Sequence, residues 1–275
     1  MTDHQMKEDD YKIHARYYDG AYDSKADLVD LPFYVGEASK SDGPILEVGC
    51  GTGRITKAIA DLGKEVVGVD ASTTMLEILK KSIEGKEVEN LIQLIEGDLR
   101  TLQLGRKFPL IILPFRVLQH MYTLEDQKSA FERISAHLEP GGAVIFDVFH
   151  PRFESVYSGV GEAIEDLSWQ DNNGNRVTRT FVKDRFDKVD QTFEGRFIYR
   201  TFKADACIKE DVTPLKMACY TVPHITLLLD GAGLEARKRF GGFDRAPLDN
   251  AAREIIVVAG KTEAAHLPQD PWQTT

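Results

Sequence analysis

The sequence predicts an α/β fold in which helices cover a seven-stranded sheet and an antiparallel β insertion follows the fifth strand. Between residues 44 and 149, short apolar runs alternate with stretches of helix length, a pattern typical of a parallel sheet with covering helices. Val and Ile dominate these runs without strict alternation, as in strands buried on both faces. From residue 150 to 222 the pattern changes, because aromatic residues there are interleaved with charges.

The elements of the first half follow one another along the chain. The predicted strands are ILEVG (45–49), EVVGVD (65–70), LIQLIEGD (91–98), FPLIILPF (108–115) and AVIFDVF (143–149). The predicted helices between them are Ile55–Asp61, Ser72–Ser82 and Leu124–His137. Ser72 has the residue type of a helix N-cap, and Pro-Gly-Gly at 140–142 ends the third helix before the next strand. A helix at 223–231 and strands at 234–240 and 254–259 complete the sheet.

The insertion predicts a meander of three or four antiparallel strands. Turn signals at 171–174 and 187–190 separate its strand-like stretches. It is either a flap that covers a sheet edge or a lid over an active site. We favour the lid, because segments that follow sheet strands lie where ligands bind.

Arginines of the insertion also allow two interpretations. They stand at positions 176, 179, 185, 196 and 200, and the acids at 184, 187, 190 and 194 match them. The arginines either bind an acidic substrate or pair across strands. We favour a solvated, cross-paired sheet face.

Charge and cysteine content exclude several classes of partner. The 275 residues include 34 Lys and Arg against 44 Asp and Glu, a formal charge of −10. The basic residues are dispersed and outnumbered, so we expect no nucleic-acid or membrane partner. Cys50, Cys207 and Cys219 lack the close paired spacing of a disulfide framework or a zinc site, and we expect no metal. A polar N-terminus without a long apolar run leads us to expect a cytoplasmic protein.

A glycine-rich turn, LEVGCGTGR at 46–54, links the first strand to the first helix. Such a turn lets a ligand approach the backbone, while N–H groups at the helix start point at it. A dinucleotide fingerprint that begins at Gly49 would require glycine where Arg54 stands. The glycines lie instead at 49, 51 and 53, preceded by Glu47, so we expect a nucleotide-like ligand but not the NAD pattern.

Two further carboxylates end the next strands. Asp70 ends the second strand, where a carboxylate can accept both hydroxyls of a ribose. Asp98 ends the third strand, where it can accept an exocyclic amine such as that of adenine. Because the carboxyl ends of parallel strands meet at one edge of the sheet, we expect Glu47, Asp70 and Asp98 to lie together there.

The segments ILEVGCGTGRIT, VVGVD, EGDLRTL and LEPGGAVIFDVF resemble the successive motifs of the class I S-adenosylmethionine-dependent methyltransferases. This resemblance covers residues 44–149 and, more loosely, the closing strands to 260, and it implies a Rossmann-like sheet. It implies that the three glycines make room for the methionyl part of S-adenosylmethionine and that Asp70 holds the ribose. It also implies that Met75 packs on the adenine. The donor site that we expect consists of Tyr18, Glu47, Gly49, Gly51, Gly53, Asp70, Ala71, Met75, Asp98, Leu99 and Phe115.

Within this family the chain is similar to small-molecule N-methyltransferases with a β-stranded insertion, including those that act on amino sugars and peptide amines. LGRKFPLIILPF, the insertion and HITLLLDGAGL carry this resemblance. Asp10-Tyr11 and Tyr18-Asp19 resemble an aromatic segment that folds over the donor. We therefore divide the chain into an N-terminal helical lid (1–43), a donor-binding domain (44–149 and 223–261), the insertion (150–222) and a flexible tail (262–275).

Methyl transfer from a sulfonium requires mainly alignment in a dry site, with a base only where the nucleophile is protonated. His120 follows the fourth strand and either orients or deprotonates the acceptor, with an imidazole pKa of about 6.5, or packs at a helix start. Tyr11 and Tyr18 either pack against the domain or reach the site; we assign Tyr11 with His120 to catalysis. His150 and Arg116 are assigned to the acceptor, although His150 before proline also suits a chain crossover.

The leading hypothesis is S-adenosylmethionine-dependent methyl transfer to a small-molecule acceptor, at nitrogen rather than oxygen. The alternative is a non-catalytic regulatory module that binds S-adenosylmethionine. Arg54 disfavours an NAD-dependent oxidoreductase. The acidic charge, and LPFR at 113–116 in place of an Asn-Pro-Pro-Tyr-like motif, disfavour nucleic-acid methylation. The sequence leaves a homodimer open.

Overall fold

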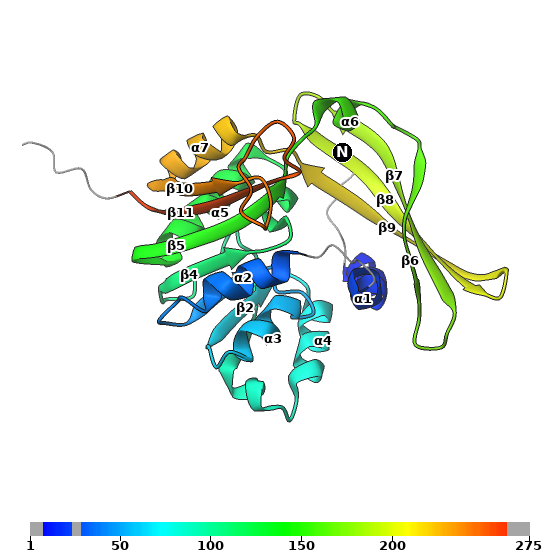
Figure 1. Ribbon diagram of the computed structural model, residues 1–275, viewed down its shortest axis with the longest axis horizontal. Coiled ribbons are helices and arrows are strands. Elements are labelled where there is room, and N and C mark those ends of the chain that lie inside the picture. The colour runs from blue at the N-terminus through cyan, green and yellow to red at the C-terminus, as the bar shows by residue number, and fades with distance from the viewer. Residues whose placement is uncertain (1–7, 24–28, 263–275) are drawn as a thin grey trace, which may run out of the picture.

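The computed structural model describes residues 8–23 and 29–262 and contains two separate sheets (Figure 1). Seven strands form a mixed sheet in the order β10-β11-β5-β4-β1-β2-β3, and four form an antiparallel sheet in the order β6-β7-β8-β9. This arrangement confirms the predicted α/β fold with a Rossmann-like sheet and an antiparallel insertion after the fifth strand. The predicted tail lies outside the described residues, apart from Thr262.

The seven-stranded sheet contains the strands that the apolar runs predicted. They are β1 (Ile45–Val48), β2 (Val66–Asp70), β3 (Ile92–Glu96), β4 (Phe108–Leu113), β5 (Leu138–Phe149), β10 (Leu234–Phe240) and β11 (Glu254–Lys261). The strand β11 runs antiparallel to both of its neighbours, whereas β1 to β5 pair in parallel. The carboxyl ends of β1, β2, β4 and β5 therefore meet at one edge.

Helices cover both faces of this sheet. Ile111 on β4 belongs to a buried cluster with residues of α5 (Leu124–His137) and α7 (Val222–Gly231). Its neighbours Leu110 and Ile112 belong to a second cluster, with residues of α2 (Asp30–Ala38) and α3 (Arg54–Ala60). Successive side chains of a strand point to opposite faces, so burial on both faces explains why the runs show no alternation.

One further α-helix and two short 3₁₀ helices complete the described part of this domain. They are α4 (Thr73–Ile83) and two 3₁₀ helices, η1 (Glu87–Leu91) and η2 (Val117–His120). Ser72 caps α4 as predicted, because its hydroxyl accepts a hydrogen bond from the Met75 amide at 3.3 Å. Among the described residues, no helix has both the length and the apolar composition needed to cross a bilayer.

The predicted role of Pro-Gly-Gly as a stop between helix and strand was wrong in detail. Helix α5 ends at His137, as predicted, but β5 begins at the next residue and contains the three residues. The pairing between β4 and β5 shifts register there, and Gly141 has a φ of +79°. The segment therefore forms an irregularity within the strand.

The insertion forms the second sheet, preceded by a short helix that was not predicted, α6 (Phe153–Tyr157). Its strands are β6 (Ala163–Gln170), β7 (Arg176–Asp187), β8 (Thr192–Lys203) and β9 (Ala206–Ala218). Both predicted turns are present between these strands. In the first, Oδ1 of Asp171 accepts hydrogen bonds from the amides of Asn173 and Asn175 at 2.9 and 2.8 Å.

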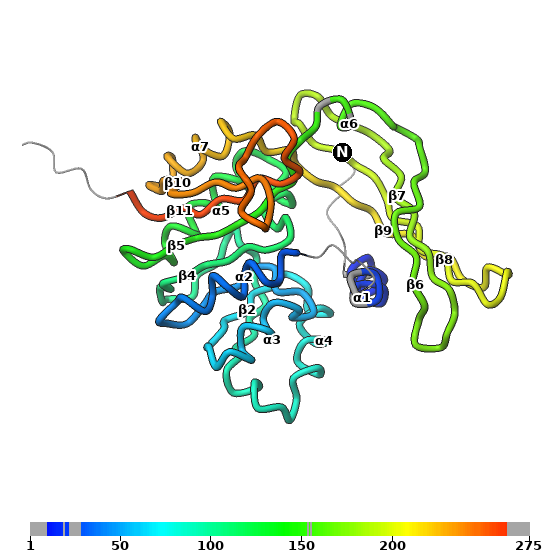
Figure 2. Tube along the Cα trace, viewed as in Figure 1, coloured from blue at the N-terminus to red at the C-terminus, as the bar shows by residue number. Residues whose placement is uncertain are grey.

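The N-terminal helix α1 (Glu8–Asp23) lies between the seven-stranded domain and the insertion (Figures 1 and 2). The ring of Tyr17 stacks on Tyr199 of β8 with 4.4 Å between centroids. Its hydroxyl donates a 2.5 Å hydrogen bond to Asp211 of β9. A side chain at Gly20 would collide with the indole of Trp169 on β6. These contacts dock α1 onto the insertion; the helical lid over 1–43 stays a prediction.

Candidate active site

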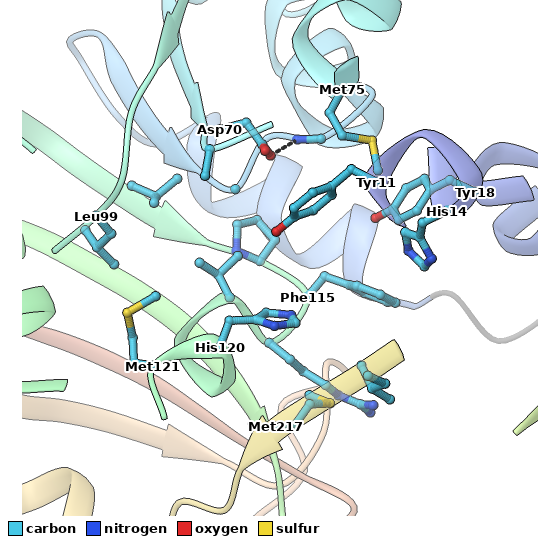
Figure 3. Close-up of a pocket in the computed structure, with 18 of the residues that line it drawn as sticks. Tyr11, His14, Tyr18, Asp70, Met75, Leu99, Phe115, His120, Met121 and Met217 are labelled. Atoms are coloured by element: carbon cyan, nitrogen blue, oxygen red, sulfur yellow. Dashed lines mark hydrogen bonds between the residues drawn. The ribbon is translucent and has the colours of Figure 1, made fainter. Parts of the chain in front are cut away.

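A cavity of about 460 Å³ lies at the carboxyl edge of the seven-stranded sheet. Its wall comes from the sheet edge and its loops, from α1, and from the inner face of the insertion. Figure 3 shows Tyr11, His14 and Tyr18 of α1 on one side of this space, with Asp70, Phe115 and His120 around it. The cavity therefore joins segments that are far apart in the sequence.

One half of the cavity contains the glycine turn and Asp70. Gly51 has a φ of +54°, and apart from the glycine and its two chain neighbours no described residue has an atom within 4 Å of the place where its Cβ would be. The missing side chain thus leaves room for a ligand against the backbone. The Asp70 carboxylate is fixed across the turn, because it accepts hydrogen bonds from the amides of Gly51 (2.8 Å) and Ser72 (2.9 Å). Gly49, Ala71 and Met75 line the same half.

Asp98 and Leu99 line the cavity beyond β3, together with Arg100, which was not predicted. The Arg100 Nε lies 2.9 and 3.0 Å from the two carboxylate oxygens of Asp98, and its amide donates to Oδ1 at 2.8 Å. These hydrogen bonds hold the pKa of Asp98 below its usual range. Asp98 is therefore an ionised, fixed acceptor at this end of the cavity.

The structure does not place Glu47 on the cavity, in contrast to the expectation. Side chains alternate along β1, so Glu47 points to α3, while Val48 lines the cavity. The buried carboxylate accepts a 2.6 Å hydrogen bond from the hydroxyl of Thr56, and burial raises its pKa to about 8.

Gly53 also lies away from the cavity. Its φ is +84°, and a Cβ there would overlap the side chain of Leu79 on α4. This glycine is therefore required by the packing of Leu79 against the start of α3, rather than by room for a ligand.

Of the two residues assigned to the acceptor, only Arg116 lines the cavity. It forms a 2.6 Å ion pair with Glu254 at the start of β11. The amide of His150 donates to the carbonyl of Arg253 at 2.8 Å, and its ring Nδ1 lies 3.1 Å from the carbonyl of Ala252. These contacts turn His150 toward the segment before β11 and away from the cavity.

A buried carboxylate that was not predicted, Asp147 of β5, shapes the loop after β4. Phe115 and Arg116 both have left-handed backbone angles, with φ of +61° and +68°. Their amides donate to Asp147 at 2.8 and 3.1 Å, and the hydroxyl of Tyr34 donates to it at 2.6 Å. Burial raises the pKa of Asp147 to about 7, against these three donors. The sequence signal was a charged residue inside the apolar run AVIFDVF.

His120 lines the cavity from η2, beside Tyr122. Protein surrounds the ring except on the cavity side, and this burial lowers its pKa to about 4. The ordinary imidazole pKa of about 6.5 that the sequence led us to expect is therefore wrong. His120 is neutral at pH 7, and it is a weak base.

His14 is a second histidine on the cavity, and the sequence analysis missed it. Burial, with the nearby Arg179 and His120, lowers its pKa to about 4. Its Nδ1 lies 3.2 Å from the hydroxyl of Tyr199. Positions 11, 14 and 18 share one helix face, so the helical spacing of Tyr11 and Tyr18 is the signal that could have found this histidine.

The insertion contributes aromatic and apolar side chains to the wall, among them Phe181, Phe193, Phe197 and Met217. Its inner face therefore encloses the cavity in addition to packing against the sheet edge. Tyr11, Tyr18 and Phe115 complete an aromatic surround that suits a cationic ligand.

Three of the five arginines of the insertion form cross-strand ion pairs on a solvated face, as predicted. Arg185, Arg196 and Arg200 form ion pairs with Glu194, Asp184 and Glu210 on partly exposed surfaces. Arg176 lies over the ring of Phe202 at 4.3 Å. Arg179 pairs with Asp166, but its side chain is only 3% exposed and lines the cavity. The solvated face was therefore wrong for Arg179.

Comparison with known proteins fits this architecture. Residues 45–142 match the family described as a methyltransferase domain. With the observed strand order, this match identifies residues 45–142 as a methyltransferase domain with a Rossmann-like sheet. Within residues 8–23 and 29–262, no group of three or more His, Cys, Asp or Glu side chains is arranged to hold a metal ion.

Similar proteins include two from Streptomyces with assigned acceptors. The cypemycin N-terminal methyltransferase of a Streptomyces species is 27% identical over 78% of this chain and 81% of its own length. The dTDP-3-amino-3,4,6-trideoxy-alpha-D-glucopyranose N,N-dimethyltransferase of Streptomyces venezuelae is 28% identical over 49% of this chain and 56% of its own length. The structure of the CcbJ methyltransferase of Streptomyces caelestis shares the fold, with a TM-score of 0.73, 22% identity, and coverage of 86% of this chain and 96% of that chain.

Proposed function

We propose that the protein transfers a methyl group from S-adenosylmethionine to an amino group of a small molecule. The observation that carries this proposal is a single cavity with two chemically different halves. One half has the backbone room at Gly51 and a fixed carboxylate at Asp70. The other half has two neutral imidazoles and an aromatic wall.

The donor-side residues fit the shape and charge of S-adenosylmethionine. Asp70 accepts the ribose hydroxyls, since carboxylate oxygens accept more than one hydrogen bond each. Met75 and Leu99 flank the adenine, and Asp98 accepts its amine. The open backbone at Gly51 receives the methionyl part. Tyr18 and Phe115 then face the sulfonium, whose positive charge an aromatic ring face stabilises.

S-adenosylmethionine supplies an activated methyl group on a sulfonium. The chain's part is to exclude water and to align the acceptor nitrogen with the methyl carbon. With a pKa of about 4, His120 is too weak a base to remove a proton from an alkylammonium ion. The acceptor therefore enters as the neutral amine, and His120 and Tyr11 orient it by hydrogen bonding. The nitrogen lone pair forms the new bond, the carbon–sulfur bond breaks with its electron pair going to sulfur, and the methylammonium product then gives one of its own N–H protons to water.

Nitrogen is favoured over oxygen as the accepting atom for a related reason. A neutral amine needs no base before it attacks, whereas an alcohol must lose its proton during the reaction. A site with two weakly basic imidazoles suits the amine. Two similar proteins are named for N-methylation, which supports the same choice.

The test has two parts. Calorimetry should detect binding of S-adenosylmethionine and S-adenosylhomocysteine to the full chain. A panel of small amines and alcohols should then be screened for S-adenosylhomocysteine release, with mass spectrometry to detect one added methyl group. Release that depends on an amine supports the proposal. Donor binding without turnover across the panel would instead support a regulatory module.

A further inference from the structure

Asp166 occupies a special position in strand β6. The pairing of β6 with β7 shifts register between Glu165, opposite Thr180, and Leu167, opposite Arg179. Asp166 is therefore the extra residue of a β-bulge. A bulge redirects a side chain and increases the local twist, and bulges are common next to active sites. Here Asp166 lines the cavity, together with the arginine of the neighbouring strand.

Arg179, on the neighbouring strand β7, holds the Asp166 carboxylate in place. Its Nε and Nη2 donate to the two carboxylate oxygens at 3.0 and 2.5 Å. The guanidinium also lies over the ring of Phe197, 4.3 Å from its centroid. The Arg179 side chain is 3% exposed, whereas that of Asp166 is 32% exposed. The carboxylate is thus the accessible member of the pair.

Within the insertion, the cavity wall around this pair is apolar. The other described residues of the insertion that line the cavity are Phe181, Phe193, Phe197, Pro214, Leu215 and Met217. Taking an ion pair out of water carries a desolvation penalty that mutual attraction offsets only in part, so such a pair is weak evidence of stabilisation. Its position in an otherwise apolar wall points to ligand binding.

We propose that Asp166, oriented by Arg179, binds a hydroxyl group of the methyl acceptor, at a distance from the accepting nitrogen. This proposal rests on the proposed function, because it identifies the acceptor end of the same cavity. Each oxygen of Asp166 receives one hydrogen bond from Arg179 and can accept another. The aromatic side chains beside it then contact the carbon skeleton of the acceptor.

The charges of Asp166 and Arg179 together favour an uncharged hydrogen-bonding group on the methyl acceptor. An ammonium group at Asp166 would also approach Arg179, whose charge opposes it. A phosphate or carboxylate would meet the accessible carboxylate before it reached the guanidinium. A hydroxyl suffers neither repulsion. The acceptor is therefore a hydroxylated amine that carries no anionic group at this position.

The test uses ring amines that differ by one hydroxyl. Cyclohexylamine and its 2-, 3- and 4-hydroxy derivatives should be titrated at pH 9, with and without S-adenosylhomocysteine, and binding followed by calorimetry or saturation-transfer NMR. Each affinity should be expressed per neutral amine, because the hydroxyl group also changes the pKa of the amine itself. Hydrogen bonds to charged groups lead us to expect at least one hydroxylated isomer to bind about 10-fold or more tightly than cyclohexylamine. That gain should disappear in Asp166→Ala.

A double variant separates binding from folding. Asp166→Ala alone leaves the buried Arg179 without its carboxylate and is expected to lower stability. Asp166→Ala with Arg179→Met replaces the ion pair by apolar groups, should fold, and should also lose the gain. Asp184→Ala is the matched control, because Asp184 is likewise the extra residue of a bulge, on β7, and pairs with Arg196 outside the cavity. This control should bind all four amines as the parent does.

The outcomes distinguish this inference from the proposed function. If no hydroxylated isomer binds more tightly than cyclohexylamine, or if the folded double variant keeps the gain, the role of Asp166 is overturned. Turnover of other amines would then still support the methyltransferase reaction. If the hydroxyl gain is present and depends on Asp166, but no S-adenosylhomocysteine binds, the proposed function fails while the hydroxyl site stands.

Discussion

The hydroxyl of Tyr34 on α2 donates a 2.6 Å hydrogen bond to Asp147 on β5. Both residues are fully or almost fully buried, and the same carboxylate accepts the amides of Phe115 and Arg116. A helix that covers one face of the sheet thus supports the loop that forms part of the cavity. Tyr34 and Asp147 are positioning residues, because they act on the site through this loop.

We expect Tyr34→Phe to lower the free energy of unfolding by about 1–3 kcal/mol, since the buried carboxylate loses one of its donors. The affinity for S-adenosylmethionine should fall as well, because Phe115 and Arg116 lose part of their support. Denaturant unfolding and calorimetry measure the two effects. Tyr157→Phe is the control, because Tyr157 is exposed, and should change stability by less than about 0.5 kcal/mol. Equal effects of the two variants would contradict the role of Tyr34.

Asp70→Ala should weaken S-adenosylmethionine binding by about 2–3 kcal/mol, because charge-assisted hydrogen bonds to the ribose are lost. The variant also releases the amides of Gly51 and Ser72, which keep the turn in shape. Calorimetry measures the change, with Asp61→Ala at the exposed end of α3 as the control. Unchanged affinity in Asp70→Ala would refute the donor pose.

His120→Asn should reduce turnover by roughly 10-fold, the effect of losing one orienting hydrogen bond, and not by the larger factor typical of a lost base. The parent should show no acid limb from this residue near pH 6.5, because the pKa of His120 is about 4. Rate profiles from pH 4 to 9 for the parent, His120→Asn and the control His224→Asn measure both effects. A limb near pH 6.5 that only His120→Asn abolishes would show that His120 is a base after all.

His14 should make the stability of the protein depend on acid. Its pKa is about 4 in the folded chain and about 6.5 in the unfolded chain. As the pH falls from 6.5 to 4, the unfolded chain takes up the proton first, so stability decreases; above 6.5 this contribution is constant. The loss from His14 approaches about 3 kcal/mol at pH 4. Urea unfolding of His14→Phe should show a shallower acid decline than the parent, and parallel curves would count against the buried, neutral histidine.

Tyr17→Ala should release α1 from the insertion without unfolding the domain. The variant loses the stack on Tyr199 and the hydrogen bond to Asp211, a truncation that typically weakens packing by about 3–5 kcal/mol. Amide hydrogen exchange should increase across α1, while α5 exchanges as in the parent. Unchanged protection of α1 would mean that other contacts suffice to dock it.

The predictable part of the site is the part encoded locally. The glycine turn and Asp70 lie within one β-α-β unit, where strand ends and turn residues determine their positions. Glu47 belongs to the same motif. Because side chains alternate along β1, however, Glu47 points to α3 and not to the cavity. Local patterns thus predict which segment reaches the sheet edge, whereas the direction of each side chain depends on its place in the strand.

The other half of the site depends on long-range packing. His14 reaches the cavity because α1 docks on the insertion, and Arg179 is buried against the ring of Phe197 and beside His14. No sequence pattern predicted the bulge that redirects Asp166, since the strand alternation on either side of it is weak. The prediction for His150 was wrong for a similar reason, because its position depends on contacts with Ala252 and Arg253, in the segment between β10 and β11.

The collision that any side chain at Gly53 would make with Leu79 has a consequence for experiments on the glycine motif. A side chain introduced at Gly51 would fill the space in which the ligand is proposed to bind, so it would weaken binding by direct steric overlap. Substitution at Gly53 would instead displace α4, and with it Met75 on the cavity wall. Loss of donor affinity in a Gly53 variant would therefore report a displacement of α4, and the melting temperature would fall with it.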